Sequence, residues 1–360
     1  MKKILFAIIF VLVGSVAVAA DTTYYCTQSG AGTRDGKSLN NAWSISDVCA
    51  DGSAWESLDN ADKIDPGDTL ILSGKFISQF VIQGSGTPGN VITIQFAENA
   101  KFSNTTWSNN AGVISGRGKN CIVINGGING IIEATDNGTG NGSTPSGTYN
   151  NQNNIYGIHF NQCDHTEVKN LTIRNLYVRT ADSNDSNGYG IGIFYEKCEE
   201  MSAHNNTITD NHRCIYLLLK NGGQNASFYN NTMKYFAWCI AGGIGSSTYV
   251  FSTVNIYDNT IEMNDRWHGQ WWDEGKGKYE WFHMDGIKLW TQSDGVSRID
   301  YISIYNNYIY GNVGTNTTAL IDMVAQNMNY MKIYNNILTA NDDCHPANAF
   351  IRVGLLDGVK

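Results

Sequence analysis

VNIYDNTI (Val254–Ile261) is the clearest copy of a phrase that recurs along the chain. Other copies are MSAHNNTI (Met201–Ile208), ASFYNNTM (Ala226–Met233), ISIYNNYI (Ile302–Ile309), MKIYNNIL (Met331–Leu338) and a fainter TEVKNLTI (Thr166–Ile173). The second asparagine of each good copy falls at Asn206, Asn231, Asn259, Asn307 and Asn336, in steps of 25, 28, 48 and 29 residues. A period in the twenties is typical of a solenoid, in which each repeat packs only on its neighbours.

The pattern inside the phrase indicates which solenoid. Apolar residues alternate, as in Val254 and Ile256, which is the period of a strand. The asparagine pair then breaks the strand, because asparagine tolerates left-handed backbone and its amide can bond an asparagine stacked above it. These features predict an all-β fold, a right-handed parallel β-helix with about three strands per coil. The alternative, a leucine-rich repeat, lacks its leucine framework here.

The N-terminus reads as a targeting segment. Residues 1–20 hold Lys2 and Lys3, an apolar run from Ile4 to Val13 and a small-residue end at Ala17–Ala20. This pattern predicts a secretory signal peptide, and the apolar run is short for a membrane anchor. We therefore expect residues 21–360 to form one exported β-helix domain, secreted or on the cell surface, with no membrane span.

The net charge and the composition limit the kinds of molecule that this protein is expected to bind. The net charge is -9, and charged residues make up 16% of the chain. An acidic protein is a poor partner for nucleic acid or an anionic membrane. A polysaccharide or other glycan remains the expected ligand, and we expect the protein to be a monomer.

The chain has 8 cysteines, all after the predicted signal peptide, so disulfides are possible in an oxidising compartment. We expect Cys26 to pair with Cys49, and Cys214 to lie within disulfide reach of Cys239. Cys163 and Cys198 also stand one coil apart. The alternative for such pairs is a ladder of reduced thiols in the core. The sequence has no Cys-x-x-Cys, which argues against a zinc site.

The N-terminal cap is expected over about residues 21–75. Ser53-Ala54-Trp55-Glu56 has the spacing of a capping box, and apolar residues follow at helical intervals as far as Ile64. A helix there would cover the open first coil. A capping helix, the strand Pro66–Leu72 and the asparagine-bearing coils together resemble the pectate-lyase-like superfamily of secreted β-helix proteins. That resemblance implies a substrate cleft on a parallel-sheet face walled by long loops, but no one activity.

Three long loops interrupt the coils. Residues 133–154 are rich in Gly, Asn, Thr and Ser, and residues 180–188 place Asp182 and Asp185 in a loosely Ca²⁺-like pattern. The third, 265–282, is rich in tryptophan and explains the 48-residue step. We expect its Trp271, Trp272 and Trp281 to contact sugar rings.

The strands that follow the asparagine phrases align on one buried isoleucine each: Ile191, Ile215, Ile240, Ile287 and Ile321. The residues after them would point outward as the column Gly192, Tyr216, Ala241, Lys288, Asp322 and Arg352. Trp290 lies in the next outward column, and Arg213, His283 and Asp285 come just before the ladder. We therefore expect one face to gather catalytic residues (Lys288, Asp285, His283, Arg213 and Asp322) beside Tyr216 and Trp290 as substrate-binding residues.

Several chemistries fit these groups. In a lyase acting on an acidic, uronate-containing polysaccharide, Lys288 or Arg213 would be the base and Asp285 would help to hold Ca²⁺. In a glycoside hydrolase, Asp285 and Asp322 would be the carboxylate pair, with Glu274 and Glu280 in reserve. A third alternative is a non-catalytic, adhesin-type glycan binder, in which Lys288, Asp322 and Arg352 form only a surface charge ladder. We favour the lyase.

Overall fold

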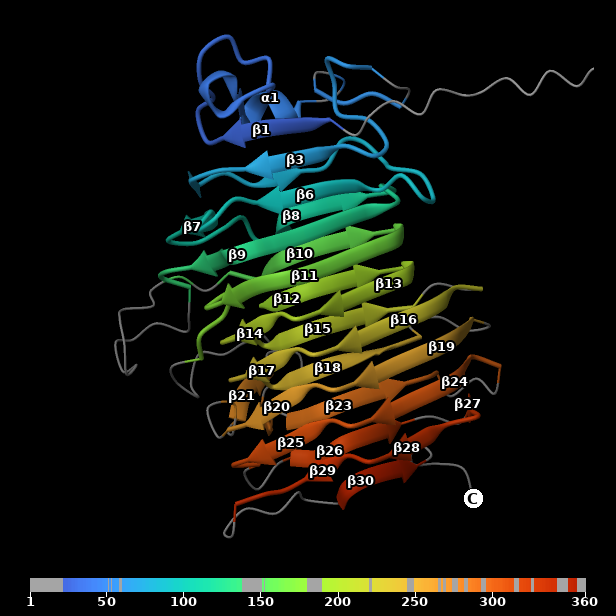
Figure 1. Ribbon diagram of the computed structural model, residues 1–360. Helices are drawn as coiled ribbons and strands as arrows, with labels where there is room; N and C mark the ends of the chain where they lie inside the picture. Colours follow the sequence, from blue (N-terminus) through green and yellow to red (C-terminus); the bar gives the residue numbers. More distant parts are fainter. Residues whose placement is uncertain are drawn as a thin grey trace, which may run out of the picture.

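A computed structural model describes residues 22–354 apart from 51, 53, 58–59, 138–150, 152, 180–189, 220–221, 245–248, 265–266, 268–269, 274–277, 282–283, 293–295, 314–316, 325–326 and 342–348. The chain forms the right-handed parallel β-helix that the repeat predicts, with coils stacked along one axis (Figure 1). Among the residues that the structure describes, no helix is long and apolar enough to cross a membrane.

One side of each coil belongs to a nine-stranded sheet in which every neighbouring pair is parallel. Its strands are β5 (Phe80–Val81), β8 (Ala111–Arg117), β10 (Ile155–Asn161), β12 (Ile191–Glu196), β15 (Arg213–Leu218), β18 (Trp238–Gly243), β23 (Met284–Trp290), β26 (Thr317–Val324) and β30 (Ala349–Gly354).

The rest of each coil belongs to a nineteen-stranded sheet that turns a corner. Before the corner run β1 (Thr23–Thr27), β2 (Trp43–Ser44), β3 (Thr69–Leu72), β6 (Ile92–Phe96), β13 (Glu199–His204), β16 (Gln224–Tyr229), β19 (Val250–Tyr257), β24 (Arg298–Tyr305), β27 (Met328–Asn329) and β28 (Lys332–Tyr334). After it run β4 (Lys75–Phe76), β7 (Lys101–Asn104), β14 (Thr207–Thr209), β17 (Thr232–Lys234), β20 (Thr260–Met263), β25 (Tyr308–Gly311) and β29 (Ile337–Leu338). Two longer strands, β9 (Ile122–Ala134) and β11 (Asp164–Arg174), pass through the corner unbroken.

The recurring asparagines form the expected ladder at this corner. The Nδ2 of Asn206 donates to Asn231 Oδ1 at 3.0 Å, and the same bond joins Asn231 to Asn259 (3.0 Å), Asn259 to Asn307 (2.9 Å) and Asn307 to Asn336 (2.9 Å). Each of these Nδ2 groups also donates to a backbone carbonyl of the coil above. The residue before each ladder asparagine has a positive φ, as the turn requires.

A second ladder lies just before this corner, on the solvent side. The rings of His204, Tyr229, Tyr257, Tyr305 and Tyr334 stack with centroids 4.5, 4.9, 4.9 and 5.0 Å apart. Because this spacing matches the distance between strands, each coil adds one ring to the stack.

The isoleucine ladder is buried inside the coil, with one correction. Ile215 is in register with Ile240, then Ile287 and Ile321, as expected, but the member above Ile215 is Ile193. Ile191 is in register with Arg213 instead.

The capping helix is present but begins earlier than predicted. Helix α1 (Ile45–Cys49) covers the first coil, and Ser44 and Asp47 form its capping box. In the predicted helical segment, Trp55 instead forms a parallel bridge with Ile64. The sequence therefore predicted the type of cap correctly and its position wrongly.

Seven of the eight cysteines lie in the described part of the chain, and all seven are free thiols. The predicted disulfide between Cys26 and Cys49 is thus not formed, since the Cys49 thiol donates to Gln79 O at 3.7 Å and accepts from Val81 N at 3.2 Å. Cys163 N lies 3.4 Å from Cys198 Sγ, so these two residues follow the alternative of a reduced ladder.

Candidate functional site

The predicted site residues on the described strands lie on the outer face of the nine-stranded sheet. One outward column runs Phe194, Tyr216, Ala241, Lys288, Asp322 and Arg352, each in register with the next. Phe194 takes the position expected for Gly192, because of the shift at Ile193. The column before the isoleucine ladder runs Arg213, Trp238 and Asp285, so it brings Arg213 and Asp285 to the same face.

Four of these side chains form one charge network. Lys288 Nζ donates to Asp285 Oδ2 at 2.8 Å and lies 3.3 Å from Asp322 Oδ2. Arg352 binds Asp322 through Nε (2.7 Å) and Nη2 (3.0 Å). Both carboxylates are fully buried, whereas the Lys288 side chain is 14% exposed. Burial of two carboxylates requires such partners, and it leaves Lys288 as the member of the Asp285–Lys288–Asp322 group that faces outward.

Arg213 lies beside this network in an aromatic sandwich. Its guanidinium carbon is 4.1 Å from the centroid of the Tyr216 ring and 4.5 Å from that of Trp238. The Trp238 ring also lies 5.3 Å from Lys288 Nζ. Two faces of π-electron density stabilise the cation and fix its orientation. Trp238 was not among the predicted site residues, although it occupies the strand position shared by Arg213 and Asp285.

Trp290 completes the aromatic part of the site. Its ring centroid is 6.0 Å from Tyr216 and 6.2 Å from Trp238, and all three residues are half-buried. Gly243 makes room for it, because a Cβ there would lie 2.8 Å from Trp290 Cγ. The site thus places aromatic rings next to the partly exposed Lys288, with Arg213 buried between two of them.

The same face continues towards the N-terminus with residues that the sequence did not single out. His159 is in register with Phe194, and their rings stack at 4.7 Å. His159 Nε2 lies 3.1 Å from Glu196 Oε2, and burial lowers the pKa of His159 although Glu196 opposes this shift. Phe194 packs 5.3 Å from Tyr216 and so joins this pair to the aromatic part of the site.

His212, directly before Arg213, is buried behind the face. Burial lowers its pKa well below the usual range, and the positive charges of Arg213 and Arg179 add to the effect. The ring packs 4.9 Å from that of Trp267, which is itself fully buried. His212 is therefore a buried, neutral residue that packs against Trp267 and Trp238.

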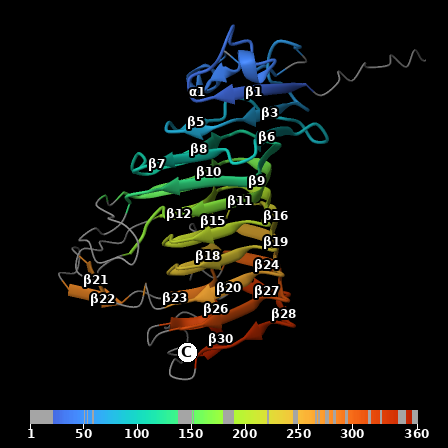
Figure 2. The ribbon, with the colours of Figure 1, turned by 60° about the vertical axis from the view of Figure 1, so that its left-hand side comes forward.

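Six other residues of the predicted site either lie outside the described residues or are described only by the strand that carries them. His283, Asp182 and Asp185 lie outside the described residues. Trp271 and Trp272 lie on β21 (Gln270–Asp273) and Trp281 on β22 (Lys278–Trp281), an antiparallel hairpin at the side of the coil that leads into β23 (Figure 2). Their roles as sugar contacts remain predictions.

A calcium ion does not fit the carboxylates of this face. Asp285 and Asp322 share the ammonium of Lys288, which occupies the position that a cation bridging them would take. Within the described ranges, no three His, Cys, Asp or Glu side chains gather as metal ligands. Calcium bound by the loop 180–188 stays a prediction.

Comparison with known proteins finds similarity in structure only. No family model and no curated protein matches the sequence. Among solved structures, the chain is similar to an alginate lyase from Paenibacillus sp. str. FPU-7, with a TM-score of 0.44 and 12% identity over 80% of this chain and 92% of that one. It is also similar to a GH136 lacto-N-biosidase from Eubacterium ramulus (TM-score 0.48, 9% identity, 92% of this chain and 68% of that one) and to the pectate lyase Pel9A (0.42, 13%, 89% and 79%).

At these identities and scores the similarity is remote. The resemblance to the pectate-lyase-like superfamily stands at the level of the fold, which the parallel coils themselves display. The function of this chain has to be argued from its own side chains.

Proposed function

We propose that this protein is an exported polysaccharide lyase that cleaves a uronate-containing polysaccharide on the outer face of the nine-stranded sheet. The observation that supports it most is a partly exposed ammonium, Lys288, beside a guanidinium, Arg213, held between two aromatic rings. Cations bind the carboxylate of a uronate, and aromatic side chains pack against the C–H faces of sugar rings.

The chemistry assigns a role to each group. A lyase removes the proton on the carbon next to the uronate carboxylate and expels the glycosidic oxygen from the neighbouring carbon. One C–H and one C–O bond break, a carbon–carbon double bond forms, and the departing oxygen takes a proton from solvent. Arg213 would balance the charge that grows on the substrate carboxylate, and Lys288 Nζ would take the proton.

The carboxylates behind Lys288 support this role. Asp285 accepts a hydrogen bond from Nζ at 2.8 Å and holds the Lys288 side chain in place, and Lys288 has to lose its own proton before it can act as the base. Asp322, held by Arg352, fixes the other side of the ammonium and is a positioning residue. The hydrolase alternative is weaker, because a hydrolase needs two carboxylates in contact with the sugar, and both are fully buried.

A glycan-binding protein without catalysis is the second candidate. The observation that favours it is the mutual pairing of Asp285, Lys288, Asp322 and Arg352, which would also suit a purely structural charge ladder. Such a protein would bind polysaccharide through Trp290 and its aromatic neighbours and release no product.

One assay series separates these functions. Purified protein is incubated with polygalacturonate, alginate or a neutral glucan, and both near-ultraviolet absorbance and reducing ends are followed. A lyase produces both signals, a hydrolase only reducing ends, and a binder neither. Lys288→Ala should lower turnover by ~10²-fold or more, compared at a temperature at which circular dichroism shows both proteins folded, because the change also leaves two buried carboxylates without their shared ammonium. The matched control is Lys332→Ala, at an exposed lysine on β28 of the other sheet, which should leave turnover unchanged. Full activity in Lys288→Ala would refute the proposed site.

A further inference from the structure

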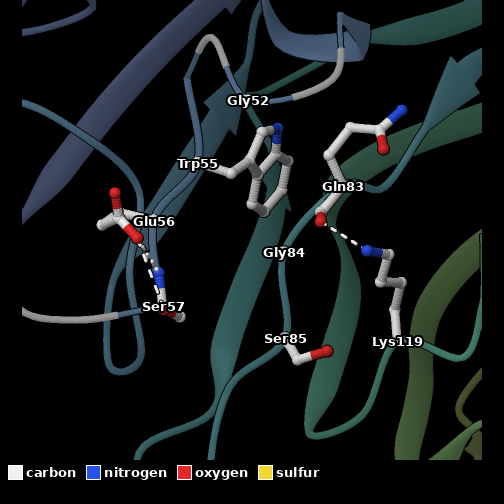
Figure 3. A pocket seen from close by; sticks show the side chains of 8 residues that line it. All are labelled: Gly52, Trp55, Glu56, Ser57, Gln83, Gly84, Ser85 and Lys119. Atoms are coloured by element: carbon white, nitrogen blue, oxygen red, sulfur yellow. Dashed lines mark hydrogen bonds between the residues drawn. The ribbon is translucent and has the colours of Figure 1, made fainter.

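A pocket of about 290 Å³ opens at the N-terminal end of the coil. It lies between the segment that follows α1 and the turns that follow β5 and β8 (Figure 3). In the nine-stranded sheet, β8 and β23 are separated by five strand spacings, or ~24 Å. The pocket is therefore a distinct place on the molecule.

The wall of the pocket is a tryptophan held in a fixed position. Trp55 Nε1 donates to Val48 O at 2.7 Å, and the residue is 5% exposed. Gly84 packs directly on its ring, since a Cβ at this glycine would lie 2.5 Å from Trp55 Cε3. The ring thus cannot turn away, and the part of it that lines the pocket is preformed.

Polar groups stand on both sides of this ring (Figure 3). On one side, Glu56 Oε1 accepts from the backbone N–H of Ser57 at 2.8 Å, which lowers the pKa of Glu56 and keeps it a carboxylate. On the other, Lys119 Nζ donates to Gln83 O at 2.6 Å. Ser85 Oγ, which accepts from Asn120 N at 3.1 Å, adds a hydroxyl. The protein itself holds each of these groups in place.

We infer that this pocket is a non-catalytic binding site for a single sugar ring. Sugar hydroxyls both donate and accept hydrogen bonds, and the pocket offers a carboxylate acceptor, an ammonium donor and hydroxyls that do both. The indole wall supplies the apolar surface against which a ring C–H edge packs. The volume is at the small end for ligand sites, which suits one ring.

Isothermal titration and ligand-observed NMR with glucose, glucosamine and galacturonate test the inference. The site should bind at least one of the three in the range of ~1 mM. Lys119→Met and Glu56→Gln should each weaken binding about 10-fold, because each removes one charge-assisted bond. Lys75→Met, at an exposed lysine on β4, is the matched control and should leave binding unchanged.

Glu56→Gln protects the test against misfolding. Lys119→Met removes the bond from Lys119 to Gln83 O and so alters the turn. Glu56 lies at the surface, so Glu56→Gln keeps the fold and tests the pocket without that change. Turnover on the nine-stranded sheet should be unaffected by either variant. The inference is overturned if none of the three sugars binds, or if binding survives both pocket variants but is lost in Lys288→Ala, which would assign it to the catalytic face.

Discussion

The asparagine corner and the outward column of the nine-stranded sheet run along the same coils and use them in opposite ways. At the corner, Asn206 to Asn336 repeat one residue, and each amide bonds its copy in the next coil. On the sheet, the rungs change from Phe194 and Tyr216 to Lys288 and Asp322. A repeated rung is satisfied by its own copies and needs no ligand. A column whose residues differ from coil to coil can present several kinds of functional group to a ligand.

Breaking the repeated ladder should have the largest effect on stability. In Asn259→Leu, the amide bonds to Asn231, Asn307 and Phe228 O are lost and leave buried polar groups unpaired. We expect a loss of about 3 kcal/mol in the free energy of unfolding, measured by urea denaturation. Asn255→Leu, which alters an outward residue of the same strand, is the control and should change stability by ~0.5 kcal/mol or less. Equal losses in the two variants would contradict a special role for the ladder.

Breaking the charge network should cost less, because part of it reaches solvent. Asp322→Asn leaves Lys288 and Arg352 without their shared carboxylate, and we expect a loss of about 2 kcal/mol. The control is Asp300→Asn, which breaks the 3.0 Å pair with the exposed Arg298 and should cost ~0.5 kcal/mol or less. A double-mutant cycle of Asp285→Asn with Lys288→Met should show coupling, and additive losses would mean that this pair is not stabilising.

A third effect depends on pH. A hydrogen bond from His204, together with Lys169, lowers the pKa of Glu167 from 4.5 to about 2, although partial burial opposes the shift. The lowered pKa means that this carboxylate stabilises the fold above about pH 4.5, and that the contribution is lost as pH falls towards 2. Glu167→Gln should therefore lower the free energy of unfolding by about 1 kcal/mol at pH 7, which is measured as a lower melting temperature. Near pH 2 it should have little effect. The same melting difference at both pH values would contradict the assignment.

The smallest effect is expected in the outer ring stack. Tyr257→Leu removes one ring from contacts of 4.9 Å with Tyr229 and with Tyr305. The residue is half-buried, and we expect a loss of ~0.5–1 kcal/mol. Tyr301→Leu, at a residue that is 54% exposed and stacks on one ring, Tyr330, instead of two, serves as the comparison. A loss in Tyr257→Leu as large as in Asn259→Leu would overturn the contrast between ladder and surface.

The fold was predictable because the repeat that specifies it occurs in several copies. The capping helix occurs only once in the chain, so no second copy supports its position. Ser53 to Glu56 and Ser44 to Asp47 share the same capping spacing, and the sequence alone does not rank them. The structure uses the second, because Trp55 instead pairs with Ile64 and lies under Gly84. The tertiary contacts of one indole ring decided between two equal local patterns.

The placement of the candidate residues on one sheet face was predictable where the strand register was inferred correctly, and it was missed where the inferred register was two residues off. Ile191 and Ile193 fit a period of two equally well, and the alignment used Ile191. The choice between them depends on a tertiary contact that the sequence does not show: a Cβ at Gly192 would lie 2.6 Å from Cys214 O of the next coil. Because the prediction placed Gly192 in the outward column instead of Phe194, it missed that the face continues to His159.

The asparagine ladder also gives the molecule a mechanical signature. Each coil is joined to its neighbours by the same bonds, so a force applied along the chain should detach coils one after another rather than all together. A coil of 25 residues would add ~85 Å of extended chain per event. The coil of 48 residues, which carries the hairpin of β21 and β22, would add ~160 Å and would stand out in the force record.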